Sequence, residues 1–371
     1  MVLHWEIPTY VTRVLDTLRA AGYRGYLVGG SLRDLLRGVT PHDYDMTTDA
    51  TPEEMLEVFR DFRVIPTGLK HGTVTVLSDG NPIELTTHRV DGAYLDARRP
   101  ERVSFTRSLQ GDLSRRDFTV NAMAWNPETG LVDLFDGQRD LARGILRAVG
   151  DAETRFREDA LRILRAFRFS AQLCFEIDPE TMAGAARAAE GLARISVERI
   201  FAELSRMLEG TDAARGLAAL RAAGCEKYVF FDTVIGDIDV DINALPPKAA
   251  LRLAALAPQL SLEDARALCR RWHAPNAFAD ELCAYLEACR APLPTSPYEA
   301  RRFVCGYWRG FEGAMLLRAA RGEDTAEAAA LCKRVARDGS AVELRRLAVN
   351  GKELQQLGVL PCRTADRKSV V

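Results

Sequence analysis

The chain has 371 residues, of which 47% are hydrophobic and 27% are charged, and its formal net charge is −2. A chain of this length is too long for one ordinary hydrophobic core, so we expect two to four domains. The near-neutral charge excludes a protein that is basic over its whole surface. Any surface that binds nucleic acid must therefore be a local patch.

The cysteines and the apolar segments exclude further classes. Eight cysteines are scattered without the C-x-x-C spacing of a zinc site, and their pattern does not indicate a disulfide framework. The N-terminus has no apolar core of a secretory signal, and no apolar run reaches the length of about 18 residues that a membrane span needs. The sequence therefore predicts a protein of the reducing cytoplasm with no membrane partner.

Helix and strand patterns alternate in the first third of the chain. A helix is expected at residues 8–21, a strand at 26–28, a helix through Arg33, and a strand that carries Asp43. Thr51 followed by Pro52 is typical of a helix N-terminus, and that helix should end near Phe59. The later strands are expected at residues 63–65, 73–77, 82–87 and 131–135, with a long loop at 90–103 and an apolar segment at 118–125.

From Asp140 onward strand patterns nearly vanish and helical periodicity dominates. The expected helices are residues 151–174, 179–192, 196–208, 212–223, 247–256, 262–272, 278–288, 298–306, 312–320 and 325–337. The patterns thus predict an α/β head followed by an all-helical arm.

The first chemical motif is Tyr26-Leu-Val-Gly-Gly-Ser-Leu-Arg-Asp34, followed by Asp43-Tyr-Asp45. Gly29 and Gly30 allow a sharp turn, and a helix that begins near Ser31 would point main-chain N–H groups toward a phosphate. On a strand, Asp43 and Asp45 would point to one face and could bind the same Mg²⁺ ions together with a triphosphate. Each feature alone is also typical of a solvated turn, but their combination predicts metal-assisted nucleotidyl transfer.

The second motif is Arg115-Arg116-Asp117 before an apolar segment. An arginine fork suits triphosphate oxygens, and a carboxylate suits ribose hydroxyls. An ion pair at a helix start explains the same residues equally well.

The third motif is Glu158-Asp159, followed by arginines at every third position: Arg162, Arg165 and Arg168. On one continuous helix Asp159 and these arginines would share a face. A solvated charged face is the commoner explanation of such spacing. An Asp–Arg pair can also present hydrogen-bond acceptors and donors to the edge of a nucleobase.

In this order the three motifs resemble the class II tRNA nucleotidyltransferases, the CCA-adding enzymes of the polymerase β superfamily. The resemblance extends from about residue 20 to residue 210. Four intervening stretches, at residues 71–74, 83–89, 133–137 and 195–200, also look like the family, although His88 stands where the family usually has Phe.

The resemblance implies a role for each matching residue. Asp43 and Asp45 would hold Mg²⁺, with Glu84 as a nearby third carboxylate of the catalytic site. Within the nucleotide-binding set, Asp159 and Arg162 would read the base. The implied nucleotide-binding residues are Gly29, Gly30, Arg33, Arg116, Asp117, Asp159, Arg162, Arg165 and Arg168.

The implied fold is α+β, with a polymerase-β-like nucleotidyltransferase head that contains a mixed sheet, followed by an all-helical neck, body and tail. The expected domains are a catalytic head (1–138), a neck with the base-reading motif (139–210), a body (211–292) and a truncated tail (293–360). We expect residues 361–371 to be a non-native end, because helical patterns stop abruptly before them.

The implied reaction is template-independent, Mg²⁺-dependent addition of C, C and A from CTP and ATP to the 3′ end of tRNA, with release of pyrophosphate. The loop at residues 90–103 would act as a lid that switches the enzyme from C to A. The alternatives are a poly(A) polymerase, a partial enzyme that adds only CC or only A, and an inactive RNA-binding relative.

Overall fold

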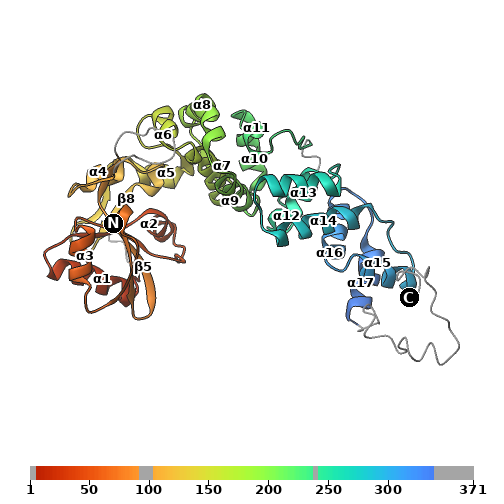
Figure 1. Cartoon of the computed structure of the whole chain (residues 1–371), viewed down its shortest axis with the longest axis horizontal. Coiled ribbons are helices and arrows are strands. Elements are labelled where there is room, and N and C mark those ends of the chain that lie inside the picture. Colours follow the sequence, from red (N-terminus) through yellow and green to blue (C-terminus); the bar gives the residue numbers. More distant parts are fainter. Residues whose placement is uncertain (1–5, 92–102, 237–240, 338–371) are drawn as a thin grey trace. The chain divides into compact units, whose positions relative to one another are not determined.

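The computed structural model describes residues 6–91, 103–236 and 241–337, which form two compact units (Figure 1). The first unit contains the residues up to Met207 together with Arg215–Val229, and the second contains Leu208–Ala214 and the residues from Phe230 onward. The finer division into head, neck, body and tail stays a prediction. The expected non-native end and the last part of the expected tail lie outside the described residues.

A seven-stranded sheet forms the centre of the first unit, in the order β3-β4-β5-β2-β1-β8-β9. Strands β2 and β5 run parallel, whereas the other neighbouring pairs are antiparallel. The expected head with a mixed sheet is therefore confirmed. The strands are β1 (Gly25–Val28), β2 (Asp45–Thr48), β3 (Arg63–Gly68), β4 (Thr73–Ser78), β5 (Asn81–Thr87), β8 (Met123–Asn126) and β9 (Gly130–Asp133).

Helices α1 (Thr9–Ala20) and α3 (Pro52–Val58) pack on this sheet (Figure 1). Strand β4 alternates buried and half-buried residues, so Val74 and Val76 face the same core as Val11 and Val14 of α1. This core fixes the sheet, and the sheet in turn fixes the residues at its strand ends. The other helices of the head are α2 (Gly29–Leu36), η1 (Leu69–His71), α4 (Leu109–Ser114), η2 (Thr119–Asn121) and α5 (Gly137–Arg143).

Two local predictions are wrong. Strand β2 begins at Asp45, so Asp43 lies in a bend before the strand. The spacing that would point two strand residues to the same face therefore does not apply to Asp43 and Asp45. The expected single helix at residues 151–174 consists of α6 (Ala152–Glu158) and α7 (Leu161–Leu173). Asp159 lies at the break with extended backbone angles (φ −141°, ψ 101°), and therefore does not share a helix with the arginines of α7.

The two ends of the long loop pair with each other. Strands β6 (Arg89–Asp91) and β7 (Val103–Phe105) form a separate antiparallel sheet. The ring of Phe105 lies so close to Gly72 that a Cβ atom there would come within 2.6 Å of it. The predicted lid is residues 90–103, and all of it except its two ends lies at residues 92–102, outside the described residues.

The remaining elements of the described residues are helices, apart from a short parallel pair of strands, β10 (Ile145–Leu146) and β11 (Glu176–Ile177), which the sequence patterns did not predict. The first unit continues with α8 (Pro179–Ala188), η3 (Ala189–Arg194), α9 (Val197–Leu208), α10 (Ala213–Ala222) and α11 (Glu226–Val229). The second unit contains α12 (Ala249–Leu256), α13 (Leu262–Arg271), α14 (Asn276–Arg290), α15 (Pro297–Gly306), α16 (Phe311–Ala320) and α17 (Ala326–Arg337).

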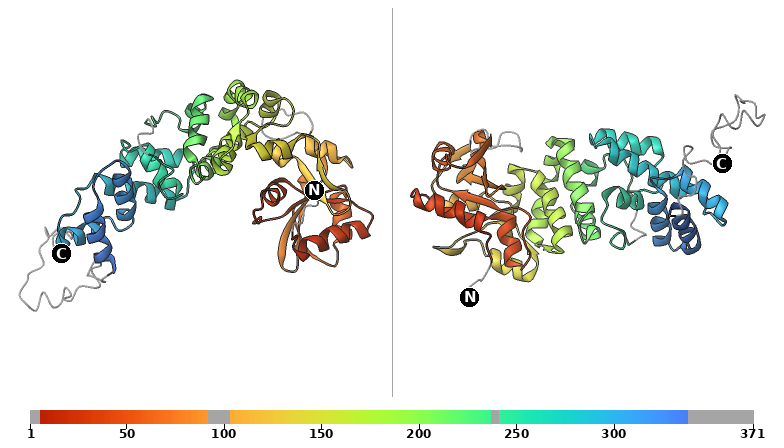
Figure 2. Two further views of the ribbon diagram at one scale, coloured as in Figure 1. Left: turned by 180° about the vertical axis from the view of Figure 1, so that it is seen from behind. Right: turned by 90° about the horizontal axis from the view of Figure 1, so that it is seen from below.

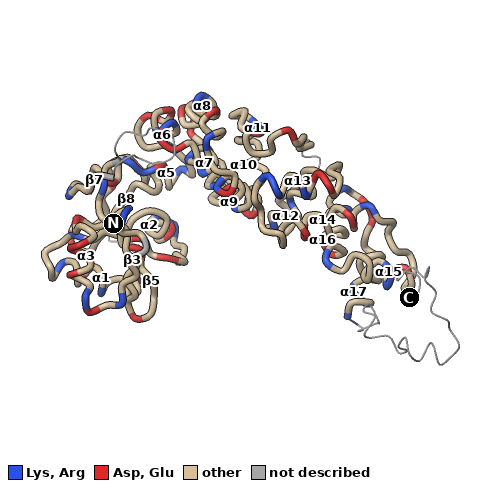
Figure 3. Tube along the Cα trace, viewed as in Figure 1, with Lys and Arg blue, Asp and Glu red and all other residues tan. Residues whose placement is uncertain are grey.

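The second unit is a layered array of these helices (Figure 2). Helix α14 packs against α12, α13 and α16, and α15 packs against α17. Acidic and basic residues are interspersed along its helices (Figure 3). Among the helices in the described ranges, none combines the length and apolarity that a membrane crossing requires.

Helix α3 provides a test of the local energetics. The Thr51 hydroxyl accepts a hydrogen bond from the Glu54 N–H at 3.3 Å, and the Glu54 carboxylate accepts one from the Thr51 N–H at 2.8 Å. We expect Thr51→Ala to lower the free energy of unfolding by about 1 kcal/mol, because the helix loses its cap. Urea unfolding measures the loss, and Thr51→Ser, which keeps the hydroxyl, should restore most of it. Equal stabilities of the Ala and Ser variants would contradict the assignment.

Candidate active site

A cavity of about 380 Å³ lies in the first unit, where β1, β2, β4 and β5 meet the segment after α4 and helices α7 and α9. Six arginines and four carboxylates line it, so its charged lining has an excess of positive charge. The volume and the mixture of charges suit a small anionic ligand. The charged lining residues are Asp45, Glu84, Arg89, Arg115, Arg116, Asp117, Asp159, Arg162, Arg165 and Arg199.

Two of the predicted catalytic carboxylates lie side by side. Asp45 is the first residue of β2, and in the parallel pairing with β5 it stands opposite Glu84. Burial, together with the negative charges of Asp43 and Glu84, raises the pKa of Asp45 to about 6, and Arg116 opposes this shift. Asp43 is exposed and does not line the cavity, but it lies near enough to act on Asp45.

These carboxylates fit a divalent cation. They offer hard oxygen donors, and their mutual repulsion is relieved when a cation binds between them. Within the described ranges, His, Cys, Asp and Glu residues form no group of three or more that could hold a metal ion. Mg²⁺ in phosphoryl-transfer sites commonly takes one or two carboxylates and completes its shell with substrate phosphates and water. The carboxylates therefore form a partial ligand set for a divalent cation, which the oxygens of a triphosphate would complete.

Gly29 lies beside both Arg116 and Asp45. It has a left-handed backbone angle (φ +71°), and a Cβ atom there would lie 3.4 Å from Nη1 of Arg116 and 3.9 Å from Oδ2 of Asp45. Helix α2 begins at Gly29, and no side chain caps its first N–H groups. These N–H groups are thus available to an anion beside Asp45.

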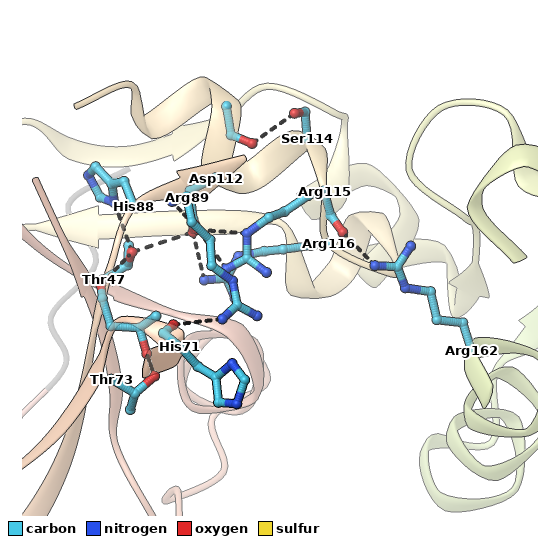
Figure 4. Close-up of polar contacts among 12 residues, drawn as sticks. Thr47, His71, Thr73, His88, Arg89, Asp112, Ser114, Arg115, Arg116 and Arg162 are labelled. Atoms are coloured by element: carbon cyan, nitrogen blue, oxygen red, sulfur yellow. Dashed lines mark hydrogen bonds and ion pairs between the residues drawn. The ribbon is translucent and has the colours of Figure 1, made fainter. Parts of the chain in front are cut away.

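Arg116 is fixed by a buried carboxylate (Figure 4). Its Nη2 donates to Oδ2 of Asp112 at 3.1 Å, while its buried Nε has no hydrogen-bond partner. Buried polar atoms are normally paired. Asp112 therefore orients Arg116, while at least one N–H group of its guanidinium has no hydrogen-bond partner among the described residues.

Asp117 and Arg165 form the shortest of the ion pairs in the cavity wall. Nε and Nη2 of Arg165 donate to Oδ2 of Asp117 at 2.8 and 2.6 Å, and the Phe118 N–H donates to its Oδ1 at 2.9 Å. Burial alone would raise the pKa of Asp117, but Arg165 outweighs it, and with Arg162 and Asn121 lowers the pKa to about 2. The predicted contact of Asp117 with a ribose stays a prediction.

The predicted base-reading pair faces the same cavity, although Asp159 is not helical. Oδ1 of Asp159 accepts from the Leu161 N–H at 3.1 Å, and Oδ2 accepts from Nη2 of Arg199 at 3.2 Å. Nη1 of Arg162 donates to Glu158 at 2.7 Å, and its Nη2 donates to the main-chain oxygen of Arg115 at 3.1 Å. Both side chains are thus held by neighbours before any ligand binds.

Four predicted nucleotide-binding residues do not line the cavity, namely Gly29, Gly30, Arg33 and Arg168. Arg33 is buried and donates to the carboxylate of Asp34 and to Oδ1 of Asn121. Gly30 lies next to the Arg33 guanidinium. Arg168 is also buried, and its Nε donates to Glu203 at 2.6 Å. Arg33 and Arg168 therefore form their hydrogen bonds with protein groups and do not face the cavity.

Three arginines that line the cavity, namely Arg89, Arg115 and Arg199, are absent from the predicted nucleotide-binding set. All three lie in stretches that resembled the family. Arg89 follows strand β5, Arg115 precedes Arg116 directly, and Arg199 is on α9. Their positions in the motifs were the available signal, but only the folded chain shows that they face one cavity.

Comparison with known families and proteins shows which proteins this chain resembles. A family model described as "Poly A polymerase head domain" matches residues 25–147, and one described as "Probable RNA and SrmB- binding site of polymerase A" matches residues 174–233. A solved structure of the CCA-adding enzyme of Bacillus stearothermophilus in complex with CTP has a TM-score of 0.81 and 33% identity, and the match covers 96% of this chain and 90% of that chain.

Curated relatives give the same result. The CCA-adding enzyme of Geobacillus stearothermophilus is 40% identical over 303 residues, which are 80% of this chain and 74% of the relative. That of Lactococcus lactis is 42% identical over 275 residues, or 72% and 68% of the two chains. That of Leuconostoc mesenteroides is 48% identical over 204 residues, or 55% and 50%. The chain spans about half the length of this relative and of three other relatives matched at 46–47% identity.

The pair of Asp117 and Arg165 predicts a pH dependence. An aspartate has a pKa of about 3.9 in the unfolded chain, and the folded value here is lower. The stabilisation is therefore complete above about pH 4 and is lost as the pH falls toward 2, and its full size is about 2 kcal/mol. Asp117→Asn should destabilise the protein at neutral pH, and the difference from the unchanged protein should shrink in acid.

Urea unfolding at several pH values between about 3 and 7 measures this difference. Asp16→Asn is the control, because Asp16 forms an exposed ion pair with Arg19, and exposed pairs contribute little. A pH-independent difference for Asp117→Asn would contradict the assignment.

Proposed function

The chain belongs to the family of CCA-adding enzymes, and from this premise we propose that it adds C, C and A from CTP and ATP to the 3′ end of tRNA without a template. The observation that carries the proposal is the position of the Asp45 and Glu84 carboxylates beside the arginine-lined wall of one cavity. Carboxylates for a metal and arginines for phosphates are the two parts that nucleotidyl transfer requires.

The family implies a divalent metal, and we propose Mg²⁺. Asp45 would hold it, with Asp43 and Glu84 as neighbouring donors. The bound ion would neutralise triphosphate charge and lower the pKa of the tRNA 3′-hydroxyl. The protein groups would orient the triphosphate: Gly29, where α2 begins without a side-chain cap, lies near both the guanidinium of Arg116 and the carboxylate of Asp45. Catalysis then depends mainly on positioning and charge neutralisation.

Base selection is proposed for Asp159 and Arg162. Cytosine and adenine both carry an exocyclic amino group where uracil and guanine carry a carbonyl oxygen, and a carboxylate accepts only from the former. The Asp159 carboxylate is oriented by Arg199 and by the Leu161 N–H, and Arg162 is oriented by Glu158. A wall with fixed acceptors and donors can therefore accept both CTP and ATP and reject UTP and GTP.

A poly(A) polymerase is the second candidate, since both matching family models are described by poly(A) polymerases. The two functions differ in product. With tRNA that lacks its 3′ end, we expect two additions from CTP alone, none from ATP alone, and C, C and A when CTP and ATP are supplied together. Repeated ATP addition would favour the second candidate, and an end at CC would indicate a partial enzyme. No incorporation would indicate the inactive RNA-binding relative.

We also propose a reducing cytoplasmic location, which the seven free cysteines of the described ranges support. The domain roles of the resemblance belong to the same proposal: a catalytic head and a base-reading neck, followed by a body and tail that contact tRNA. These roles agree with the cavity, whose lining residues come from the expected head and neck alone.

The metal-binding role of Asp45 predicts a loss of activity without a loss of stability. Asp45→Asn should abolish incorporation of both C and A, because the cation loses its central carboxylate. The variant should not melt at a lower temperature, since the carboxylate it removes is buried beside two like charges. Asp79→Asn, which alters an exposed ion pair with Arg13, is the control. Activity within about tenfold of the unchanged enzyme, about 1.4 kcal/mol, would remove Asp45 from the site.

The base-reading assignment predicts a change in specificity. Asp159→Ala should weaken use of CTP and ATP and relax discrimination against UTP and GTP, because the acceptor that rejects a carbonyl edge is gone. The ratio of kcat/KM values for CTP and UTP measures the effect. Glu198→Ala, one position from Arg199 on α9, is a control on an element that also contributes to the wall. An unchanged ratio with only slower turnover would show that Asp159 does not read the base.

A further inference from the structure

Asp112 is a buried carboxylate that none of the roles above uses. It lies in the first turn of α4, its side chain has no exposed surface, and it does not line the cavity. A buried carboxylate is costly unless its lone pairs are satisfied by charged or polar donors. The donors that satisfy Asp112 therefore indicate its purpose.

Two adjacent arginines of the cavity wall share this one carboxylate (Figure 4). Nε and Nη2 of Arg115 donate to its Oδ1 at 3.0 and 2.7 Å. Nη2 of Arg116 donates to its Oδ2 at 3.1 Å. Burial alone would raise the pKa of Asp112, but Arg116 and Arg115 outweigh it and lower the pKa to about 2. The carboxylate is thus ionised at neutral pH and offsets part of the repulsion between the two guanidinium groups.

The same carboxylate is attached to the catalytic strand. The Thr47 hydroxyl lies 3.4 Å from Oδ2 of Asp112, and Thr47 is two residues after Asp45 on β2. The Arg89 main-chain N–H donates to Oδ1 at 3.4 Å. His88 Nδ1 contacts the Thr47 hydroxyl at 2.8 Å (Figure 4). Asp112 therefore connects the two arginines to the strand that carries the metal-binding carboxylate.

We propose that Asp112 is a positioning residue that presents Arg115 and Arg116 as a pair to the triphosphate of the nucleotide, and that it does so without touching the nucleotide. The proposal rests on the proposed function only in naming the ligand as a nucleoside triphosphate. The polyphosphate chain is common to CTP and ATP. Loss of Asp112 should therefore weaken both nucleotides by the same factor and leave the choice between them unchanged.

Asp112→Asn is the direct test. The variant keeps the shape of the side chain but removes its charge and turns an acceptor into a donor, so Arg116 or Arg115 loses its partner. We expect the Kd of inorganic tripolyphosphate and the KM of CTP and ATP to rise roughly tenfold, with the CTP/ATP ratio and the KM for tRNA unchanged. Isothermal titration calorimetry with tripolyphosphate alone, on the full chain, measures the first quantity.

Asp140→Asn is the matched control. Asp140 is also a buried aspartate of the same unit that accepts from an arginine, Arg147, at 3.2 Å and from the hydroxyl of Thr119 at 2.7 Å, but neither it nor Arg147 lines the cavity. It should lower the melting temperature as Asp112→Asn does and leave tripolyphosphate binding unchanged. Equal tripolyphosphate affinities in the two variants would overturn the proposal, because Asp112 would then be a structural residue only.

A second variant covers the case in which Asp112→Asn does not fold. Arg115→Gln leaves Asp112 paired with Arg116 and removes one guanidinium of the pair, so tripolyphosphate binding should again weaken severalfold. Unchanged binding in this variant would overturn the proposal. Tripolyphosphate binding requires neither tRNA nor a base. A protein whose tripolyphosphate affinity depends on Asp112 but which adds no CCA would therefore refute the proposed function and leave this inference standing.

Discussion

Arginines that face an open cavity have to be oriented before an anion binds, and buried or half-buried carboxylates orient them in the first unit. Each of three carboxylates, Asp112, Asp117 and Glu158, accepts from an arginine that lines the cavity. Such pairs cost desolvation energy, so they are weak evidence for stability. Their effect is to fix where the positive charge points, which lowers the cost of ordering these side chains when a ligand binds.

The fold supplies this arrangement from segments far apart in sequence. The parallel pairing of β2 with β5 sets Asp45 beside Glu84, and the core under the sheet keeps both strands in register. Asp159 lies at the break between α6 and α7, and its side chain lines the cavity. In one continuous helix it would instead lie on the same helix surface as the arginines of α7. Backbone geometry at strand ends and helix breaks therefore decides which charges meet.

The sequence predicted most elements and the family, because periodic apolar residues and ordered motifs are local signals. The comparisons confirm the family, and the capping box at Thr51 confirms that local signals can be read accurately.

The wrong predictions have a common cause. Apolar spacing continues through Asp159 without Gly or Pro, so the helix break was invisible. Glu203, the partner of Arg168, lies 35 residues away, and spacing alone cannot show such a pair. Asp43 was misplaced because only the pairing of β2 defines where the strand begins.

One hydrogen bond joins the two parts of the proposed site. Nη2 of Arg162, on the wall assigned to the base, donates to the main-chain oxygen of Arg115, next to the arginines assigned to the phosphates (Figure 4). The phosphate chain is the same in CTP and ATP, whereas the bases differ in size. A pocket that accepts both CTP and ATP must hold the phosphates in one position and accommodate bases of two sizes at its other end. The Arg162–Arg115 bond and the Arg165–Asp117 ion pair both connect α7 to the segment after α4, so under the proposed function the adjustment between C and A would come from groups other than these.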